Sequence, residues 1–148
     1  MYKTHKAVYV YSPFEKEYVS IDEKIVDLIK AIWAKGIDTI NSCQKNEGLI
    51  WIEFATVFDA ERFINILRKP LYDMPFDYAD WFFSRIEGGE GDYLKPWKHT
   101  ANIWDFGEVI DDTYYNKQPE FFSISTRFPV EDYKRVLFII SEGSSGRL

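Results

Sequence analysis

The sequence predicts an α+β fold in which helices cover one face of an antiparallel sheet. Short segments of alternating apolar residues and amphipathic segments with helical spacing follow one another along the chain. Its 148 residues suit one domain with a sizeable core. A segment of 49 residues, 70–118, interrupts the pattern and is too long for a simple connection. We therefore expect one α+β domain with a long insertion.

The first strand is predicted over residues 6–11, where small apolar and aromatic residues alternate. A helix is predicted to begin at Ser20, because Glu23 completes a capping box three residues later. Gly36 is expected just after the end of this helix, in the C′ position. The predicted apolar stripe of the helix consists of Ile21, Ile25, Leu28, Ile29 and Ile32.

A second strand (37–42) and a third strand (49–55) are predicted on either side of a polar turn. Thr56 is expected to cap a second helix, with Asp59 at its third position and Pro70 beyond its end. The predicted apolar stripe of this helix consists of Phe58, Phe63, Ile66 and Leu67.

After the insertion, a strand is predicted over 121–128, and a last helix is predicted from Pro129, whose fixed φ suits a first helical position. Its expected inward residues are Tyr133, Val136, Leu137 and Ile140. This order matches the ferredoxin-like, or split βαβ, plan with an extra C-terminal helix. Residues 1–142 are predicted to form a single domain, with 70–118 as an insertion or lid and 143–148 as a flexible tail.

An aromatic face is predicted opposite the helices. In the ferredoxin-like plan the strands 6–11 and 49–55 are neighbours, so alternation places Tyr9, Tyr11 and Trp51 together, joined by Arg127 from the last strand. RNA-recognition domains stack bases on aromatic residues at comparable positions. The insertion either covers this face as a second core layer or leaves an aromatic cleft.

Arg127 is expected to need an anionic partner, because a guanidinium is costly to bury among aromatic rings. An acid of the insertion, such as Asp105 or Glu108, would make Arg127 a clamp that holds the lid. A ligand phosphate or carboxylate would instead make it a specificity residue. The surplus acid of the insertion favours the clamp slightly.

Cys43 is the only cysteine and lies where the second strand is predicted to end. A nucleophilic cysteine needs a histidine, a cation or a helix N-terminus beside it, and His5 and His99 are both distant in sequence. A structural, half-buried thiol is therefore favoured, and Ser42 and Gln44 are expected to supply hydrogen bonds at the strand terminus.

The predicted ligand-binding residues are Tyr9, Tyr11, Ser42, Cys43, Gln44, Trp51 and Arg127. In the alternative of an enzyme, Cys43 or His99 would be catalytic. No ligand-spacing motif indicates a metal, the loop 87–93 lacks the patterns of an EF-hand and a P-loop, and no cofactor is expected.

Composition limits the partners. The net charge is −6, and segment 70–118 carries ten acidic and four basic residues, which disfavours nucleic acid as a partner. One cysteine excludes an internal disulfide and indicates the cytoplasm, and no apolar run approaches the roughly 18 residues of a membrane span. The aromatic content, 12 Phe, 10 Tyr and 5 Trp, predicts a bulky core, a binding surface or a homo-oligomer interface.

The stretch VSIDEKIVDLIKAIWAKGIDTINSCQ resembles a pattern in small proteins of bacteria, phages and large DNA viruses, in which Asp-Glu and a helix precede Gly-Ile-x-Thr-x-x-Ser-Cys-Gln. TRFPVEDYKRVLFI is similar to a strand–helix unit near the end of such proteins. A looser similarity links Asp22, Glu23, Thr39, Ser42 and Cys43 to the N-terminal segment of the wybutosine-pathway methyltransferase family. The first resemblance implies a phage or viral protein, such as a host-interaction factor or a minor structural protein, in the cytoplasm of the host cell.

The leading hypothesis is a non-catalytic domain that binds a small anionic or nucleotide-like molecule, or a protein partner, through the aromatic face and the Ser42–Gln44 corner. The alternative is a small enzyme that acts on a nucleotide-like substrate.

Overall fold

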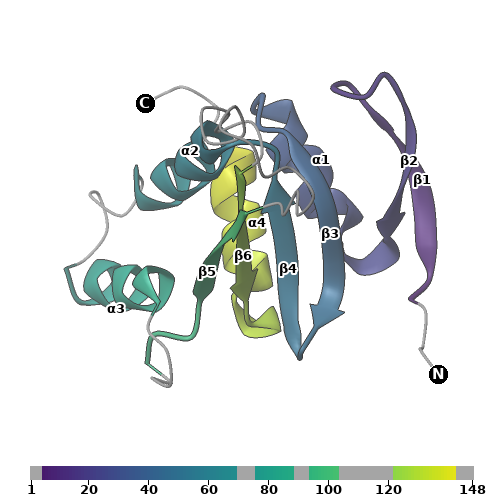
Figure 1. Cartoon of the computed structure of the whole chain (residues 1–148). Coiled ribbons are helices and arrows are strands. Elements are labelled where there is room, and N and C mark those ends of the chain that lie inside the picture. The colour runs from purple at the N-terminus through teal and green to yellow at the C-terminus, as the bar shows by residue number, and fades with distance from the viewer. Residues whose placement is uncertain (1–4, 70–75, 89–93, 104–121, 143–148) are drawn as a thin grey trace.

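A computed structural model of the chain describes residues 5–69, 76–88, 94–103 and 122–142. Within them, four strands form an antiparallel sheet in the order β3-β4-β6-β5, and two further strands form a separate hairpin beside β3 (Figure 1). The strands of the sheet are β3 (Thr39–Asn46), β4 (Leu49–Phe54), β5 (Lys98–Ile103) and β6 (Phe122–Phe128), and those of the hairpin are β1 (Ala7–Ser12) and β2 (Glu17–Asp22). The predicted α+β class with an antiparallel sheet is confirmed.

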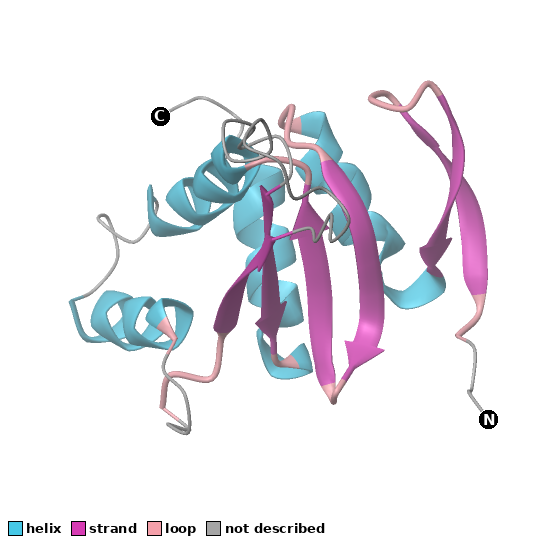
Figure 2. Ribbon diagram, viewed as in Figure 1, coloured by secondary structure: helices cyan, strands magenta, loops and turns pink. Residues whose placement is uncertain are grey.

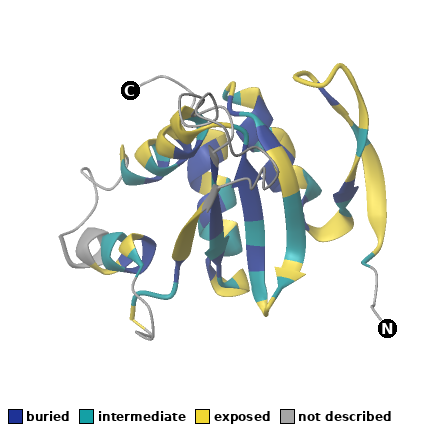
Figure 3. Ribbon diagram, viewed as in Figure 1, coloured by how far each residue is buried: buried dark blue, intermediate teal, exposed yellow. Residues whose placement is uncertain are grey.

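Helices pack on one face of the sheet, which is its far face in Figure 2, and the helix of residues 76–87 lies beyond the edge strand β5. They are α1 (Val26–Ala34), α2 (Val57–Arg68), α3 (Phe76–Glu87) and α4 (Tyr133–Glu142), with 3₁₀ turns at Glu23–Ile25 and Val130–Asp132. Ile50, Ile52 and Phe54 of β4 form one core with buried residues of α1, α2 and α4. Figure 3 shows buried positions in the sheet and on the helices behind it. None of the described helices is long and apolar enough to cross a membrane.

The N-terminal hairpin corrects two predictions. The strand over 6–11 is confirmed, but it pairs with β2, so the predicted helix start at Ser20 is wrong. Val19 and Ile21 are more buried than Tyr18 and Ser20, which is the period of a strand, and pairing with β1 overrides the local resemblance to a capping box.

The predicted neighbourhood of the strands 6–11 and 49–55 is also wrong, because β4 pairs with β3 on one side and β6 on the other. The ferredoxin-like strand order is therefore not confirmed. The hairpin adjoins β3 at the edge of the main sheet instead (Figure 1).

The end of α1 agrees with the sequence. Gly36 adopts a φ of 78°, its N–H donates to Trp33 at 2.8 Å, and the N–H of Ile37 donates to Ile32 at 3.3 Å. This is a Schellman motif with Gly36 in the C′ position. Arg62 of α2 donates to the carbonyl oxygen of Gly36 at 2.9 Å, so two helices are joined at this end.

Thr56 caps α2 as predicted. Its hydroxyl accepts from the N–H of Asp59 at 3.1 Å and donates to the Asp59 carboxylate at 2.7 Å. In the predicted apolar stripe, Phe63 and Leu67 are buried, but Phe58 is 73% exposed. The prediction for Phe58 is wrong because it lies in the first turn, on the outer side of the helix.

The last strand is confirmed as β6, and the helix after it begins later than predicted. Pro129 has an extended ψ of 148° and precedes a 3₁₀ turn, whose residue Asp132 donates its N–H to the Pro129 carbonyl oxygen at 2.9 Å. Val136 and Ile140 are buried as expected, and Tyr133 and Leu137 are partly buried against the core.

Two elements of the predicted insertion are described, α3 and β5. Phe82 of α3 contacts Trp97 edge to face at 6.3 Å, and Trp97 stacks on Phe128 of β6 at 4.6 Å between ring centroids. This part of the insertion therefore packs on the helix side and extends the sheet, rather than covering the opposite face. Pro70, Asp105, Glu108, the remainder of segment 70–118 and the tail 143–148 lie outside the described residues.

Candidate functional site

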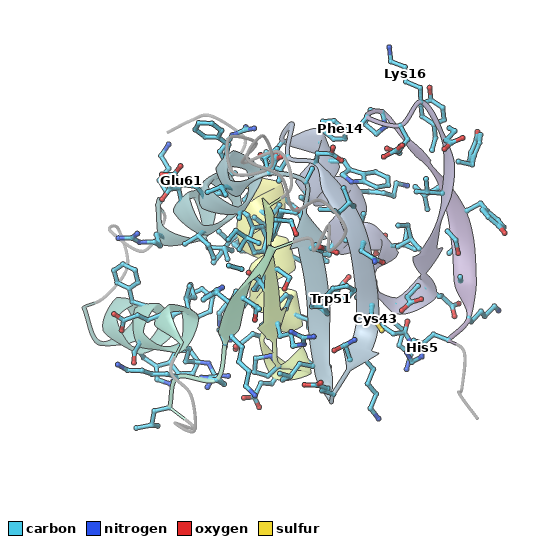
Figure 4. The ribbon with its side chains drawn as sticks, viewed as in Figure 1. His5, Phe14, Lys16, Cys43, Trp51 and Glu61 are labelled. Carbon is cyan, nitrogen blue, oxygen red and sulfur yellow. The ribbon has the colours of Figure 1, made fainter. Side chains whose placement is uncertain are left out.

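A cavity of about 850 Å³ lies between α2 and α3, above β5 and β6. Its apolar lining consists of Val57, Ala60, Ile64, Phe83, Ile86 and Ile124. Its polar lining consists of Glu61, Arg68, Ser84, Glu87, Lys95, His99 and Thr126. Glu61 marks the α2 wall in Figure 4. The volume falls in the range of about 300–1,000 Å³ that is usual for small-molecule sites.

His99 lies in the floor of this cavity with both ring nitrogens engaged. Nε2 is 2.7 Å from the carbonyl oxygen of Ile86, and Nδ1 is 3.0 Å from the hydroxyl of Thr126. A carbonyl oxygen only accepts, so Nε2 donates to Ile86, and Nδ1 shares its hydrogen bond with the Thr126 hydroxyl. His99 is held between α3 and β6 and has no free nitrogen for acid–base chemistry.

Arg68 is the cation of the cavity with unused donor capacity. Its guanidinium lies 4.6 Å from the ring centroid of Phe83, and its Nε is buried without a hydrogen-bond partner. The other cation, Lys95, is 3.5 Å from the carboxylate of Glu87. Among the described residues Arg68 thus has an aromatic neighbour and no ion pair, and a buried unsatisfied donor of this kind favours an additional acceptor.

The predicted aromatic face does not assemble. Trp51 and Arg127 are cross-strand partners, and the Arg127 guanidinium lies 5.7 Å from the Trp51 ring centroid. Tyr9 and Tyr11 lie on the separate hairpin, where Tyr11 contacts Tyr18 edge to face at 5.4 Å. The binding role of these residues stays a prediction, but the strand pairing that would have brought all of them together is absent.

Among the described residues, Arg127 contacts an amide side chain. Its Nε donates to the side-chain oxygen of Asn46 at 3.0 Å, and no described carboxylate pairs with it. The acids expected to clamp it lie outside the described residues. On the same face, Glu53 and Ser123 are buried, and the Ser123 hydroxyl donates to the Glu53 carboxylate at 2.7 Å.

Ser42, Cys43 and Gln44 lie within β3, which extends to Asn46, so the predicted end of the second strand at residue 42 is wrong. Each of the three residues has different neighbours. Ser42 is the cross-strand partner of Ile52 and lines a small cavity of about 110 Å³ between the hairpin and β3. The Gln44 N–H donates to the Asp22 carboxylate at 2.8 Å, and its side-chain oxygen accepts from the N–H of Lys24 at 3.0 Å. Cys43 is half-buried, and its thiol donates to the carbonyl oxygen of Lys45 at 3.2 Å.

Cys43 has neighbours that sequence spacing did not indicate. One ligating atom each of His5, Asp22 and Cys43 lies within 4.8 Å of the other two, and Figure 4 shows His5 beside Cys43. Burial raises the pKa of the Cys43 thiol; a backbone hydrogen bond at Lys45 opposes this, and the charge of Asp22 adds to it. The thiol is therefore kept protonated at neutral pH, which disfavours an activated nucleophile.

Comparison with known proteins gives one similarity. The chain is 29% identical over 138 residues to Uncharacterized protein R428 of Acanthamoeba polyphaga mimivirus. The aligned part is 87% of this chain and 65% of that protein, so the chain spans less than two thirds of its relative's length. No family model and no solved structure matches. The similarity agrees with a resemblance to proteins of large DNA viruses; it does not show the Ser-Cys-Gln pattern or the methyltransferase likeness.

Proposed function

We propose that this protein is a non-catalytic binding domain that holds a small anionic molecule with an apolar body in the cavity between α2 and α3. The observation that carries the proposal is the buried, unsatisfied Nε of Arg68 in the wall of an 850 Å³ cavity. An oxyanion on the ligand would accept from this donor, and the charge would strengthen the bond.

The other walls fit the rest of such a ligand. Ile64, Phe83 and Ile124 offer apolar surface on three sides, which suits a ring or a short aliphatic group. The Thr126 hydroxyl is hydrogen-bonded to His99, so Ser84 is the remaining hydroxyl of the lining. A carboxylate or monophosphate attached to a flat apolar group matches this lining.

The proposal assigns no catalytic role because of the surroundings of His99 and Cys43, the two residues that an enzyme would use. Both ring nitrogens of His99 are hydrogen-bonded, one to Ile86 and one to Thr126, and Cys43 does not line the cavity. Burial also keeps the pKa of the Cys43 thiol high. The likeness to a mimivirus protein supports a viral setting, in which a host-interaction factor or a minor structural protein remains the proposed role.

A fluorescent sulfonate, 1-anilinonaphthalene-8-sulfonate, is a suitable probe because it joins an anion to aromatic rings. The proposal predicts saturable binding at one site per chain, at least tenfold weaker in Arg68→Gln. Ile64→Trp should abolish binding by filling the cavity from α2 while the circular dichroism spectrum stays native.

The matched control is Lys30→Gln, which removes one positive charge from the exposed face of α1, away from the cavity. It should bind the probe as the unaltered protein does. Equal affinity of Arg68→Gln and Lys30→Gln would show that the cavity does not use its arginine, and the proposal would be wrong.

The pair Trp51 and Arg127 is a second candidate position for the same kind of ligand. The Trp51 indole nitrogen is buried without a hydrogen-bond partner, and the Arg127 guanidinium lies over the same ring. A ligand acceptor would satisfy the indole N–H. The cavity between α2 and α3 is preferred because a volume of about 850 Å³ lies beside its unsatisfied donor.

A further inference from the structure

We infer that His5, Asp22 and Cys43 form a binding site for a divalent transition-metal ion of the zinc class. The three residues supply an imidazole nitrogen, a carboxylate oxygen and a sulfur, and one such atom of each lies within 4.8 Å of the others. This donor set suits zinc and cobalt, whereas magnesium and calcium prefer oxygen alone. The site is separate from the cavity between α2 and α3, none of whose lining residues it uses.

The backbone around the three ligands is already fixed. Ala7 is the cross-strand partner of Asp22, so His5 lies two residues before the point where β1 meets the end of β2. The N–H of Glu23 donates to the carbonyl oxygen of Lys6 at 2.8 Å, which fastens the chain next to His5 to the chain next to Asp22. Little ordering of the main chain would therefore remain when an ion binds.

Asp22 and Cys43 are joined by a second set of hydrogen bonds. One oxygen of Asp22, Oδ2, accepts from the N–H of Gln44 at 2.8 Å, which orients the carboxylate. The Gln44 side chain in turn accepts from Lys24, so β3 is held against the turn that follows β2. Such outer contacts are typical of metal sites, because they aim the ligands before the ion arrives.

The ligating atoms of His5, Asp22 and Cys43 need to move only slightly closer together to coordinate an ion. Around a tetrahedral zinc ion, ligating atoms lie about 3.5 Å apart, so separations of up to 4.8 Å must shrink by on the order of 1 Å. All three side chains are half-buried, which leaves room for that change and for a water as fourth ligand. Binding would replace the thiol proton with the metal, and the proton would leave to solvent.

The chemistry of the three ligands predicts a readout independent of any activity. Cys43 is the only cysteine of the chain, so a thiolate-to-cobalt charge-transfer band in the near ultraviolet can arise only from it. Reduced protein titrated with Co²⁺ should show this band and saturate at one ion per chain, and Zn²⁺ should displace the cobalt. The band should be absent from Cys43→Ser.

The other two ligands are tested by affinity. His5→Ala and Asp22→Asn should each weaken Co²⁺ binding at least tenfold. Glu23→Gln, which neutralises the exposed acid next to Asp22, is the matched control and should change affinity less than twofold. The inference is overturned if no charge-transfer band forms, or if His5→Ala and Asp22→Asn bind Co²⁺ as well as Glu23→Gln does. Neither result bears on the probe titration of the other cavity.

Discussion

Arg85 of α3 and Asp132 of the turn before α4 form a buried bidentate ion pair. Nε of Arg85 is 3.2 Å from both oxygens of Asp132, and Nη2 is 3.0 Å from one of them. The same carboxylate, whose side chain is 1% exposed, also accepts from Trp97 at 2.8 Å and from Arg135 at 2.7 Å. One buried acid thus holds α3, the segment before β5 and α4 together.

Asp132→Ala should lower the free energy of unfolding by about 3–5 kcal/mol, because it leaves buried donors of Arg85 and Trp97 without an acceptor. Urea unfolding followed by tryptophan fluorescence measures the change. Glu131→Gln is the matched control: Glu131 also pairs with Arg85, at 2.7 Å, but its side chain is 70% exposed. It should cost about 0.5 kcal/mol or less. Similar losses for the two variants would contradict the central role of Asp132.

Gly88→Ala should destabilise the protein by more than about 2 kcal/mol, whereas Gly48→Ala should cost only about 1 kcal/mol. Both glycines have a positive φ, 78° and 82°. A Cβ on Gly88 would lie 2.4 Å from the carbonyl oxygen of Trp97, while one on Gly48 would meet nothing within 4 Å. The difference in melting temperature between the variants therefore measures the close approach of α3 to Trp97. Equal melting temperatures would show that the backbone at Gly88 and Trp97 can move apart at little cost in stability.

Asp38→Asn should stabilise the protein at neutral pH and have little effect near pH 4. Burial, with the charges of Asp59 and Glu15, raises the pKa of Asp38 to about 6. The folded state then binds an extra proton between about pH 4 and pH 6, so this group's contribution to stability falls as pH rises through that window. Partial exposure limits the gain at pH 7.5 to on the order of 1 kcal/mol.

Urea unfolding of Asp38→Asn at about pH 4 and pH 7.5 tests this, with Glu17→Gln as a control that neutralises an exposed acid of β2. An equal gain in the free energy of unfolding at both pH values would show that the surroundings of Asp38 do not raise its pKa.

The Cys43 thiol should react slowly with iodoacetamide. Because burial raises its pKa, the pH at half-maximal rate should exceed the value of about 8.5 that is usual for a free thiol. The same protein in urea is the control, since unfolding exposes the identical thiol. Metal-free folded protein that is alkylated at pH 7 as fast as unfolded protein would support the enzyme alternative instead.

Local signals in the sequence predicted local structure well. Thr56 and Gly36 act at helix ends through bonds that span only a few residues, so their roles follow from the sequence nearby. The pairing of strands was not predictable from such signals. Ser20 and Glu23 have the spacing of a capping box, yet Ser20 faces Tyr9 across the hairpin. Because strand 6–11 was predicted beside strand 49–55 and not in a hairpin, the aromatic face predicted from that pairing was wrong as well.

The candidate sites depend on contacts between distant residues. His99 meets Thr126 only because β5 lies beside β6, and Arg68 meets Phe83 only because α3 packs near α2. His5 and Cys43 approach one another through β1 and β2. No spacing along the chain encodes these pairs, although a histidine and an arginine close to apolar residues could have been noted as candidates for a pocket.

The most direct test of the central claim is a map of amide chemical-shift changes in ¹⁵N-labelled protein during titration with 1-anilinonaphthalene-8-sulfonate. If the cavity between α2 and α3 is the ligand site, the largest changes will fall on Ile64, Arg68, Phe83, His99 and Thr126. Changes centred on Trp51 and Arg127 instead, or spread without a centre, would contradict the claim.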